Sequence, residues 1–307
     1  MRNRIFVTQF NTLTMETKAE IKNRLAGLRQ EMAARQLSAF IIPSTDPHSG
    51  EYVPEHWETR KWISGFTGSA GTAVITLEDA GLWTDSRYFI QAEEQLEGTG
   101  IRLFKDRLPE TPSIDEWLGS ILKKGDKVGI DGWVNSHQEA HALRNGLAES
   151  GLELVTMTED IFEALWKDRP SLPKTPIFIL DETRTGASCT EKIGLIQETI
   201  AKNGASAIIL SALDEIAWTL NLRGSDVHCN PVFISYLLIT DKNYTLYIYR
   251  EKITPEVMVY LEANQISVKP YLEVEQDLKR QAKRRLVISS SLFLHRLRFL
   301  VSVFTSV

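Results

Sequence analysis

The sequence predicts an α/β protein built from two tandem copies of one domain, each a mixed sheet flanked by helices. Its 307 residues exceed a typical single core and suit about two domains. Helical stretches alternate with short buried strands, as in layered α/β folds. A tryptophan followed six residues later by Gly-Ser occurs twice, in "WISGFTGS" from Trp62 and in "WTLNLRGS" from Trp218.

The first half begins with an amphipathic helix, because apolar residues over residues 16–37 are spaced mostly three or four apart. Ser86 and Ser113 are candidate caps for two later helices, since serine hydroxyls accept hydrogen bonds from the first turn. The pattern predicts further helices at 56–64, 86–96, 113–122 and 136–150, and strands at 38–43, 71–76, 80–85, 101–104, 127–131 and 152–155.

A linker then separates the halves. Residues 166–176, "WKDRPSLPKTP", hold three prolines, which resist both helix and sheet. Thr254 and Pro255 mark one later helix start as its cap and first position. The second half repeats the alternation, with helices expected at 190–204, 213–222, 254–264 and 272–285, a strand at 205–210 and a hairpin over 231–249.

The two halves align over one strand and the loop that follows it. "SAFIIPSTD" from Ser38 matches "SAIILSALD" from Ser206 in order and length, so Asp46 aligns with Asp214. Trp62 then aligns with Trp218, which stands much closer to its aspartate than Trp62 does. The first copy therefore carries a 12-residue insertion between Asp46 and Trp62.

The repeated tryptophan and glycine favour structural roles. Trp62 and Trp218 are expected to bury their rings and so anchor a short helix to the sheet. Gly68 and Gly224 are expected to end that helix, where the backbone needs a positive φ.

Composition excludes several classes of protein. A net charge of −5 without a clustered basic face argues against nucleic-acid binding, and the basic stretch at 279–285 is more typical of a solvated helix face. Cys189 and Cys229 give no disulfide framework, which fits a reducing compartment. Residues 1–14 are too polar for a secretory signal and are expected to be a disordered extension.

Familiar catalytic motifs are incomplete. "GFTGSAGT" lacks the Gly-Lys-Ser/Thr ending of a phosphate loop, and Ser69 lacks the G-x-S-x-G setting of a nucleophile elbow. His137 and His141 share a helix face, but Glu139 stands where zinc hydrolases do not carry it. An exposed helix explains this pair better than a metal site.

Two polar loops remain as candidate sites. Asp46, His48, Glu51 and Tyr52 follow the carboxyl end of a strand, where α/β proteins often bind ligands. Neither this loop nor the second one forms a complete acid–base, nucleophile or metal set.

The second loop contains Trp83, Asp85 and Arg87, where a strand gives way to a helix. A local salt bridge between Asp85 and Arg87 is the favoured structural alternative to a site.

Several long motifs resemble the cytosolic, three-domain Xaa-Pro aminopeptidases (aminopeptidase P), of the creatinase/prolidase-like metallopeptidase family. They are "AFIIPSTDPHSGEY", "SGFTGSAGTAVIT", "LWTDSRYFIQAEEQL", "ALDEIAWTLNLRGSDVHCNPVF" and "LWKDRP", and the resemblance covers residues 17–280. It implies two creatinase N-terminal-like (ribonuclease H-like) domains, with the catalytic pita-bread domain of the family absent from this chain.

The resemblance also implies an activity for the intact enzyme, the hydrolytic release of an N-terminal residue that precedes proline. That chemistry uses two divalent metal ions, often manganese, held by two Asp, one His and two Glu of the third domain. No residue here inherits a catalytic or metal-binding role, so this chain alone is expected to be inactive.

The N-terminal domains of such enzymes help to form dimers and shape the mouth of the active site, which implies a cytoplasmic homodimer with no nucleic-acid or membrane partner. The resemblance makes six residues candidates for that substrate lip: Asp46, His48, Tyr52, Trp83, Asp85 and Arg87.

The expected organisation is an extension at 1–14, domain I at 15–170, domain II at 171–285 and an atypical tail at 286–307. The tail is rich in Ser, Leu, Phe and Arg and holds no acidic residue. This composition is typical of translation in a wrong reading frame; the alternative is a genuine apolar tail that docks on a partner.

Three functions therefore stay open. The first is the non-catalytic N-terminal portion of an Xaa-Pro aminopeptidase. The second is a free-standing dimerisation or regulatory module without enzymatic activity. The third is small-ligand binding at the loop of residues 46–52.

Overall fold

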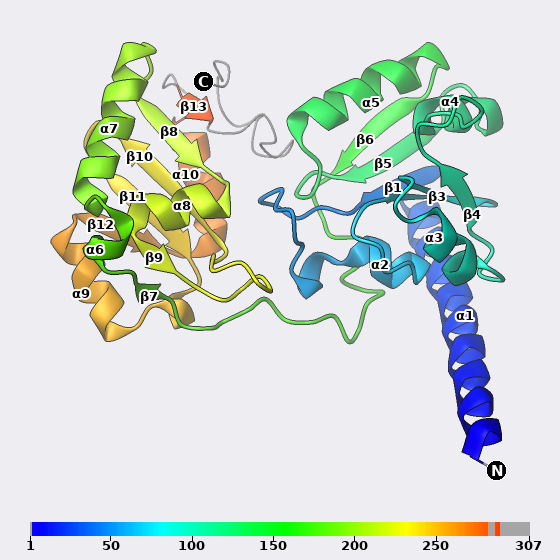
Figure 1. Cartoon of the computed structure of the whole chain (residues 1–307). Coiled ribbons are helices and arrows are strands. Elements are labelled where there is room, and N and C mark those ends of the chain that lie inside the picture. Colours follow the sequence, from blue (N-terminus) through cyan, green and yellow to red (C-terminus); the bar gives the residue numbers. More distant parts are fainter. Residues whose placement is uncertain (1, 282–285, 289–307) are drawn as a thin grey trace. The chain divides into compact units, whose positions relative to one another are not determined.

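The computed structural model describes residues 2–281 and 286–288, with side chains for residues 18–280 (Figure 1). The chain divides into two compact units. Unit 1 comprises residues up to 44 together with 56–132 and 139–170, and unit 2 comprises 45–55, 133–138 and the residues from 171 onward. Within the described ranges no helix is long and apolar enough to cross a membrane.

Unit 1 is built on a six-stranded mixed sheet in the order β4-β3-β2-β1-β5-β6. β2 pairs antiparallel with β1 and β3, whereas the β1–β5, β5–β6 and β3–β4 pairs are parallel. The strands are β1 (Ala39–Pro43), β2 (Thr72–Thr76), β3 (Ala80–Thr84), β4 (Arg102–Lys105), β5 (Lys127–Asp131) and β6 (Glu153–Met157).

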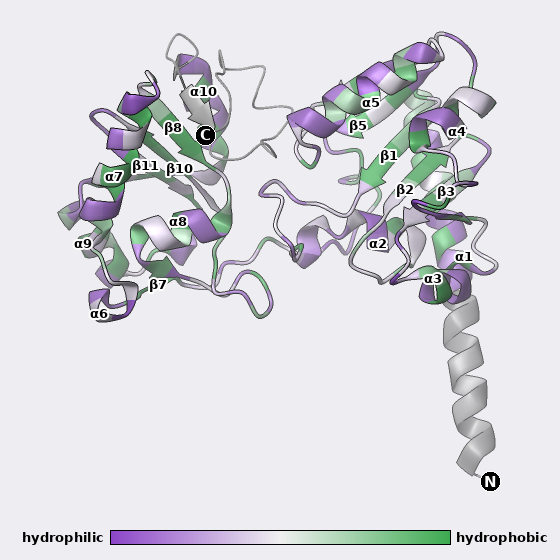
Figure 2. Ribbon diagram, turned by 45° about the horizontal axis from the view of Figure 1, so that its top comes forward, coloured by the Kyte–Doolittle hydropathy of each residue, from purple (hydrophilic) through white to green (hydrophobic). Residues whose placement is uncertain are grey.

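Helices cover both faces of this sheet, and each face has its own apolar core. Helices α1 (Arg2–Ala34), α2 (Thr59–Ser64) and α3 (Phe89–Leu96) pack on one face. Helices α4 (Ile114–Ile121) and α5 (His137–Glu149) pack on the other. Figure 2 shows mainly hydrophobic strands and helices in which hydrophilic and hydrophobic residues alternate.

Helix α1 differs from expectation at its start. Its backbone continues through residues 2–14, where a disordered extension was expected. The stretch has no proline or glycine, so nothing in it ends a helix. Ser113 caps α4 in a capping box with Glu116, as predicted, whereas α3 begins at Phe89, so Ser86 is not its cap.

Unit 2 repeats this plan with a five-stranded sheet in the order β12-β11-β10-β8-β13. Its strands are β8 (Ala207–Leu210), β10 (Ser235–Thr240), β11 (Tyr244–Ile248), β12 (Ile266–Lys269) and β13 (Leu286–Ile288). Its helices are α6 (Glu182–Thr185), α7 (Cys189–Lys202), α8 (Leu213–Leu220), α9 (Pro255–Ala263) and α10 (Val274–Gln281), and β7 (Phe178–Ile179) pairs with β9 (Leu222–Arg223).

The repeat extends to individual contacts. Arg29 Nε donates to the carbonyl of Thr76 at 2.9 Å, and Gln197 Nε2, at the equivalent position of the second copy, donates to the carbonyl of Thr240 at 2.8 Å. β13 pairs parallel with β8 as β5 does with β1. Within the described residues, unit 2 has no counterpart of α5 and β6. Three residues of the expected tail thus belong to the sheet, and 289–307 lie outside the described residues.

The glycines expected to end the two tryptophan-bearing helices lie three residues beyond the residues that do so. α2 ends at Gly65 (φ 73°) and α8 at Asn221 (φ 53°), which are the residues with the left-handed backbone. Gly68 and Gly224 instead allow close packing, because a Cβ at either position would collide with a neighbouring phenylalanine.

The two tryptophans also differ from each other. Trp62 packs against the core of unit 1, as predicted. The expectation for Trp218 was wrong, because its side chain is 50% exposed.

Candidate functional site

The loop of residues 45–55, hereafter the anchored loop, lies between β1 and α2 in sequence but belongs to unit 2. Asp46 at its base is fully buried. Its Oδ1 accepts hydrogen bonds from the backbone N–H groups of His48 at 2.7 Å and Gly50 at 3.3 Å. Its Oδ2 has no hydrogen-bond partner among the described residues. The carboxylate therefore folds the loop upon itself inside unit 2.

The imidazole of His48 ties the loop to two parts of unit 2. Nδ1 lies 2.9 Å from the carbonyl oxygen of Ser211, which can only accept, so Nδ1 carries the proton. Nε2 lies 2.9 Å from the hydroxyl of Tyr271 and accepts a hydrogen bond from it. Burial lowers the pKa of His48 to about 4, so the ring is neutral at pH 7, which agrees with this tautomer.

Tyrosine rings enclose the imidazole. Tyr236 lies 4.7 Å from His48 between ring centroids and stacks on Tyr271 at 5.3 Å. The Tyr236 hydroxyl donates to the carbonyl of Pro47 at 3.3 Å. Burial raises the pKa of both tyrosines, so each remains a protonated donor.

The charge of Asp46 is the unusual electrostatic feature of this cluster. Burial raises its pKa to about 6, although backbone N–H groups of His48, Gly50 and Ser49 offset part of the rise. Asp46 therefore changes protonation just below neutral pH.

Whereas the base of the anchored loop is buried, its tip faces solvent. Glu51 is exposed and Tyr52 is 54% exposed. Hydrogen bonds of Asp46 and His48 thus fix the base of the loop, while its tip is accessible to solvent. The two buried side chains hold the loop in place. Tyr236 and Tyr271 were missed from sequence, because nothing in the pattern indicates that a loop of the first repeat packs against the second.

The remaining candidates lie in unit 1. Asp85 accepts from Arg87 Nε at 2.9 Å and Nη2 at 2.7 Å, which is the local salt bridge weighed above. The guanidinium lowers the pKa of Asp85 to about 2. Trp83 is 5% exposed and stacks on Phe104 at 4.0 Å, so it belongs to the core of the unit.

Among the residues that the structure describes, no group of three or more His, Cys, Asp or Glu side chains is arranged to hold an ion. His141 is exposed on α5, where its Nδ1 lies 3.1 Å from Asn145 Nδ2. The described side chains thus do not fit a dinuclear metal centre.

Comparison with known families matches the creatinase/prolidase N-terminal domain twice, at residues 24–165 and 168–301. The Probable Xaa-Pro aminopeptidase P of Sordaria macrospora is 40% identical over 257 residues, which is 83% of this chain and 42% of that protein. Aminopeptidase P2 of Arabidopsis thaliana is 39% identical over 273 residues, 88% of this chain and 38% of that protein.

A solved structure agrees with these relatives. The X-prolyl aminopeptidase of Caenorhabditis elegans, described as a cytosolic enzyme with a di-nuclear active site, matches with a TM-score of 0.86 and 28% identity, over 94% of this chain and 50% of that one. The chain spans about two fifths of the length of the curated relatives above. With both domains matched, the chain belongs to the Xaa-Pro aminopeptidase family and comprises its two creatinase-like N-terminal domains.

Proposed function

We propose that these residues are the non-catalytic N-terminal part of a cytoplasmic Xaa-Pro aminopeptidase, which releases an N-terminal residue that precedes proline. The observation that supports this most is the match of both domains, in order, to relatives of that name. The two metal ions, manganese in this proposal, would be held outside the described residues, since no metal-binding group was found within them.

We further propose that the two domains support homodimerisation and contribute a lip of the active site. The anchored loop favours the lip role, because a buried base at Asp46 and His48 holds the exposed Tyr52 in a defined place. Arg87 is the second exposed candidate, held by Asp85.

The activity test uses purified protein of residues 1–307 with manganese and an Xaa-Pro-Xaa peptide. The expected result is no release of the first residue above the blank. Turnover that follows the protein through every purification step would contradict the proposal.

The lip and dimer proposals need separate measurements. Replacing the residues equivalent to Tyr52 and Arg87 in a full-length relative should raise KM several-fold, with kcat nearly unchanged. Sedimentation of the 307-residue chain should show a dimer. Unchanged KM or a monomer would remove the corresponding role.

A further inference from the structure

In unit 1, the ring of Trp62 is covered by the segment that follows β6. Phe162 approaches it edge-on at 6.1 Å between centroids, and Trp166 stacks on it at 5.3 Å. Leu165 packs against Gly27 of α1, 3.1 Å from where a Cβ would stand. The covering segment, residues 161–166, thus completes the core over α1, α2 and β1.

Unit 2 carries the same surface for such a segment. Lys192 Nζ lies 4.5 Å from the ring centroid of Trp218 and donates to the Trp218 carbonyl at 2.9 Å. Arg24, at the equivalent position of the first copy, lies 4.8 Å from the ring of Trp62 and donates to its carbonyl at 2.6 Å. Two different cations in one geometry indicate that the site itself is duplicated.

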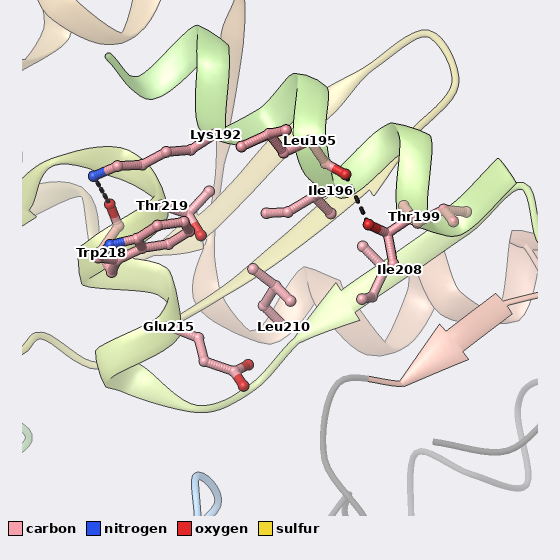
Figure 3. Close-up of a pocket in the computed structure, with 10 residues that line it drawn as sticks. Lys192, Leu195, Ile196, Thr199, Ile208, Leu210, Glu215, Trp218 and Thr219 are labelled. Atoms are coloured by element: carbon pink, nitrogen blue, oxygen red, sulfur yellow. Dashed lines mark hydrogen bonds between the residues drawn. The ribbon is translucent and has the colours of Figure 1, made fainter. Parts of the chain in front are cut away.

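The surface of unit 2 nevertheless stays open. Trp218 is 50% exposed and Leu195 59% exposed. Beside them lies a groove of about 320 Å³ between α7, α8 and β8, here called the Trp218 groove (Figure 3). Its floor includes Ile208 and Leu210, which hold the positions of Phe40 and Ile42 in the first repeat.

We propose that the Trp218 groove binds a short amphipathic peptide segment with the chemistry of the covering segment, namely bulky apolar side chains spaced like Phe162 and Trp166. The positions equivalent to Gly27 and Phe40 are Leu195 and Ile208. The added leucine narrows one end of the groove, so the segment carries a small side chain where unit 1 has Leu165.

In unit 1 the covering segment follows α5 and β6, which have no counterpart within the described residues of unit 2. In unit 1, helix α5 and strand β6 stand between Ile130 of β5 and the covering segment. Ile288 of β13 is the counterpart of Ile130, because the two pair in parallel with Ile209 and Ile41, which hold equivalent positions in the two repeats.

The probe is a fluorescein-labelled peptide of residues 158–169 with Leu165→Ala, titrated with the 307-residue protein by fluorescence anisotropy. We expect saturable one-to-one binding with Kd below about 1 mM, the range expected for a disordered segment that orders on binding. Trp218→Ala and Leu195→Asp should each weaken binding about tenfold or more. Because both side chains are largely exposed, these variants keep the core of unit 2.

Two controls make the test specific. Val259→Asp, at a 66% exposed position on α9, should leave the affinity unchanged. A peptide that also carries Phe162→Asp should not bind. Absence of saturable binding up to about 1 mM protein, or binding insensitive to Trp218→Ala, would overturn the proposal.

Other occupants of the groove would give different results. If shortening the protein to end at Ile288 tightens peptide binding about tenfold, residues 289–307 fill the groove, and the proposal fails. Self-association that Trp218→Ala abolishes, without peptide binding, would assign the groove to a second copy and would equally overturn it. None of these outcomes depends on aminopeptidase activity.

Discussion

The two units differ in how they hold the loop that follows the tryptophan-bearing helix, which is α2 in unit 1 and α8 in unit 2. In unit 1, Arg60 of α2 is 5% exposed and donates to the carbonyls of Phe66 and Gly68 and, at 2.7 Å, to Ser44 Oγ. In unit 2 the equivalent position is Ile216, which is fully buried.

Unit 2 supplies the missing polar contact from another element. Asp226 accepts from the backbone N–H of Ile234 at 2.7 Å and pairs with Lys252, whose side chain is fully buried like that of Asp226. Burial raises the pKa of Asp226 and lowers that of Lys252, while their ion pair opposes both shifts. The two repeats therefore share the path of the loop, but the side chains that hold the loop come from different elements in each repeat.

The largest expected effect is the loss of the buried ion pair. Lys252→Met leaves Asp226 buried without its counter-ion, so the free energy of unfolding should fall by about 3–5 kcal/mol. Urea denaturation measures this. The double variant Lys252→Met, Asp226→Leu should recover most of the loss, and a single-variant loss below about 1 kcal/mol would show that the pair is dispensable.

A smaller difference is expected between the duplicated tryptophans. Trp62→Ala removes a ring that packs on Phe162 and Trp166, so it should cost about 3 kcal/mol of unfolding free energy. Trp218→Ala removes a half-exposed ring and should cost about 1 kcal/mol or less. Equal losses in urea denaturation would mean that the two repeats bury their tryptophans alike.

The anchored loop predicts a pH response confined to unit 2. Asp46 has its pKa raised from 3.8 to about 6, so the stability it confers is present below pH 3.8 and is lost as pH rises to 6. His48 has its pKa lowered from 6.5 to about 4, so its contribution is full above pH 6.5 and is lost as pH falls to 4. In the unchanged protein, the contributions of Asp46 and His48 to the free energy of unfolding therefore change in opposite directions as pH rises.

Single substitutions should separate them. Relative to the unchanged protein, His48→Gln should lose stability as pH rises from 4 to 6.5, and Asp46→Asn should gain it as pH rises from 3.8 to 6, each by about 3 kcal/mol. Chemical denaturation at four pH values gives the difference curves. Flat difference curves would mean that neither group changes its pKa on folding.

The smallest effect belongs to the exposed ion pair of unit 1. Arg87→Ala removes its ion pair with Asp85, but the Arg87 side chain is 66% exposed, so the loss of unfolding free energy should be close to zero. Denaturation at low and high salt checks this, because screening should shrink the small effect further. A loss similar to that of Lys252→Met would contradict the contrast between exposed and buried pairs.

Local patterns in the sequence predicted much of the fold. The tandem repeat followed from strand and tryptophan spacing, and the caps at Ser113 and Thr254 followed from residues that accept hydrogen bonds from their own first turn. Strand β12 was missed although its residues, Ile-Ser-Val-Lys, alternate between apolar and polar, because four residues are the shortest run in which alternation indicates a strand. β13 was missed because it lies in a stretch of tail-like composition.

Long-range pairing is what the sequence could not supply. Asp46 and His48 were recognised as polar residues after a strand, but their partners Ser211, Tyr236 and Tyr271 stand in the other repeat. Periodicity reports which side of an element is buried and carries no information on which distant residues bury it. The exposure of Trp218 was mispredicted for a related reason. Its repeat partner Trp62 is covered by a segment that has no described counterpart in unit 2.

The contacts of the anchored loop also imply an order of folding events during synthesis on the ribosome. His48 and Tyr271 are 223 residues apart, so at about 5–20 residues per second the tyrosine emerges some 10–45 s after the histidine. During that interval the strands of unit 1 are free to assemble, while residues 45–55 wait in water without their binding cavity. A nascent chain halted at Pro170 would therefore contain all six strands of the first sheet, while the anchored loop would still lack its partners Ser211 and Tyr271.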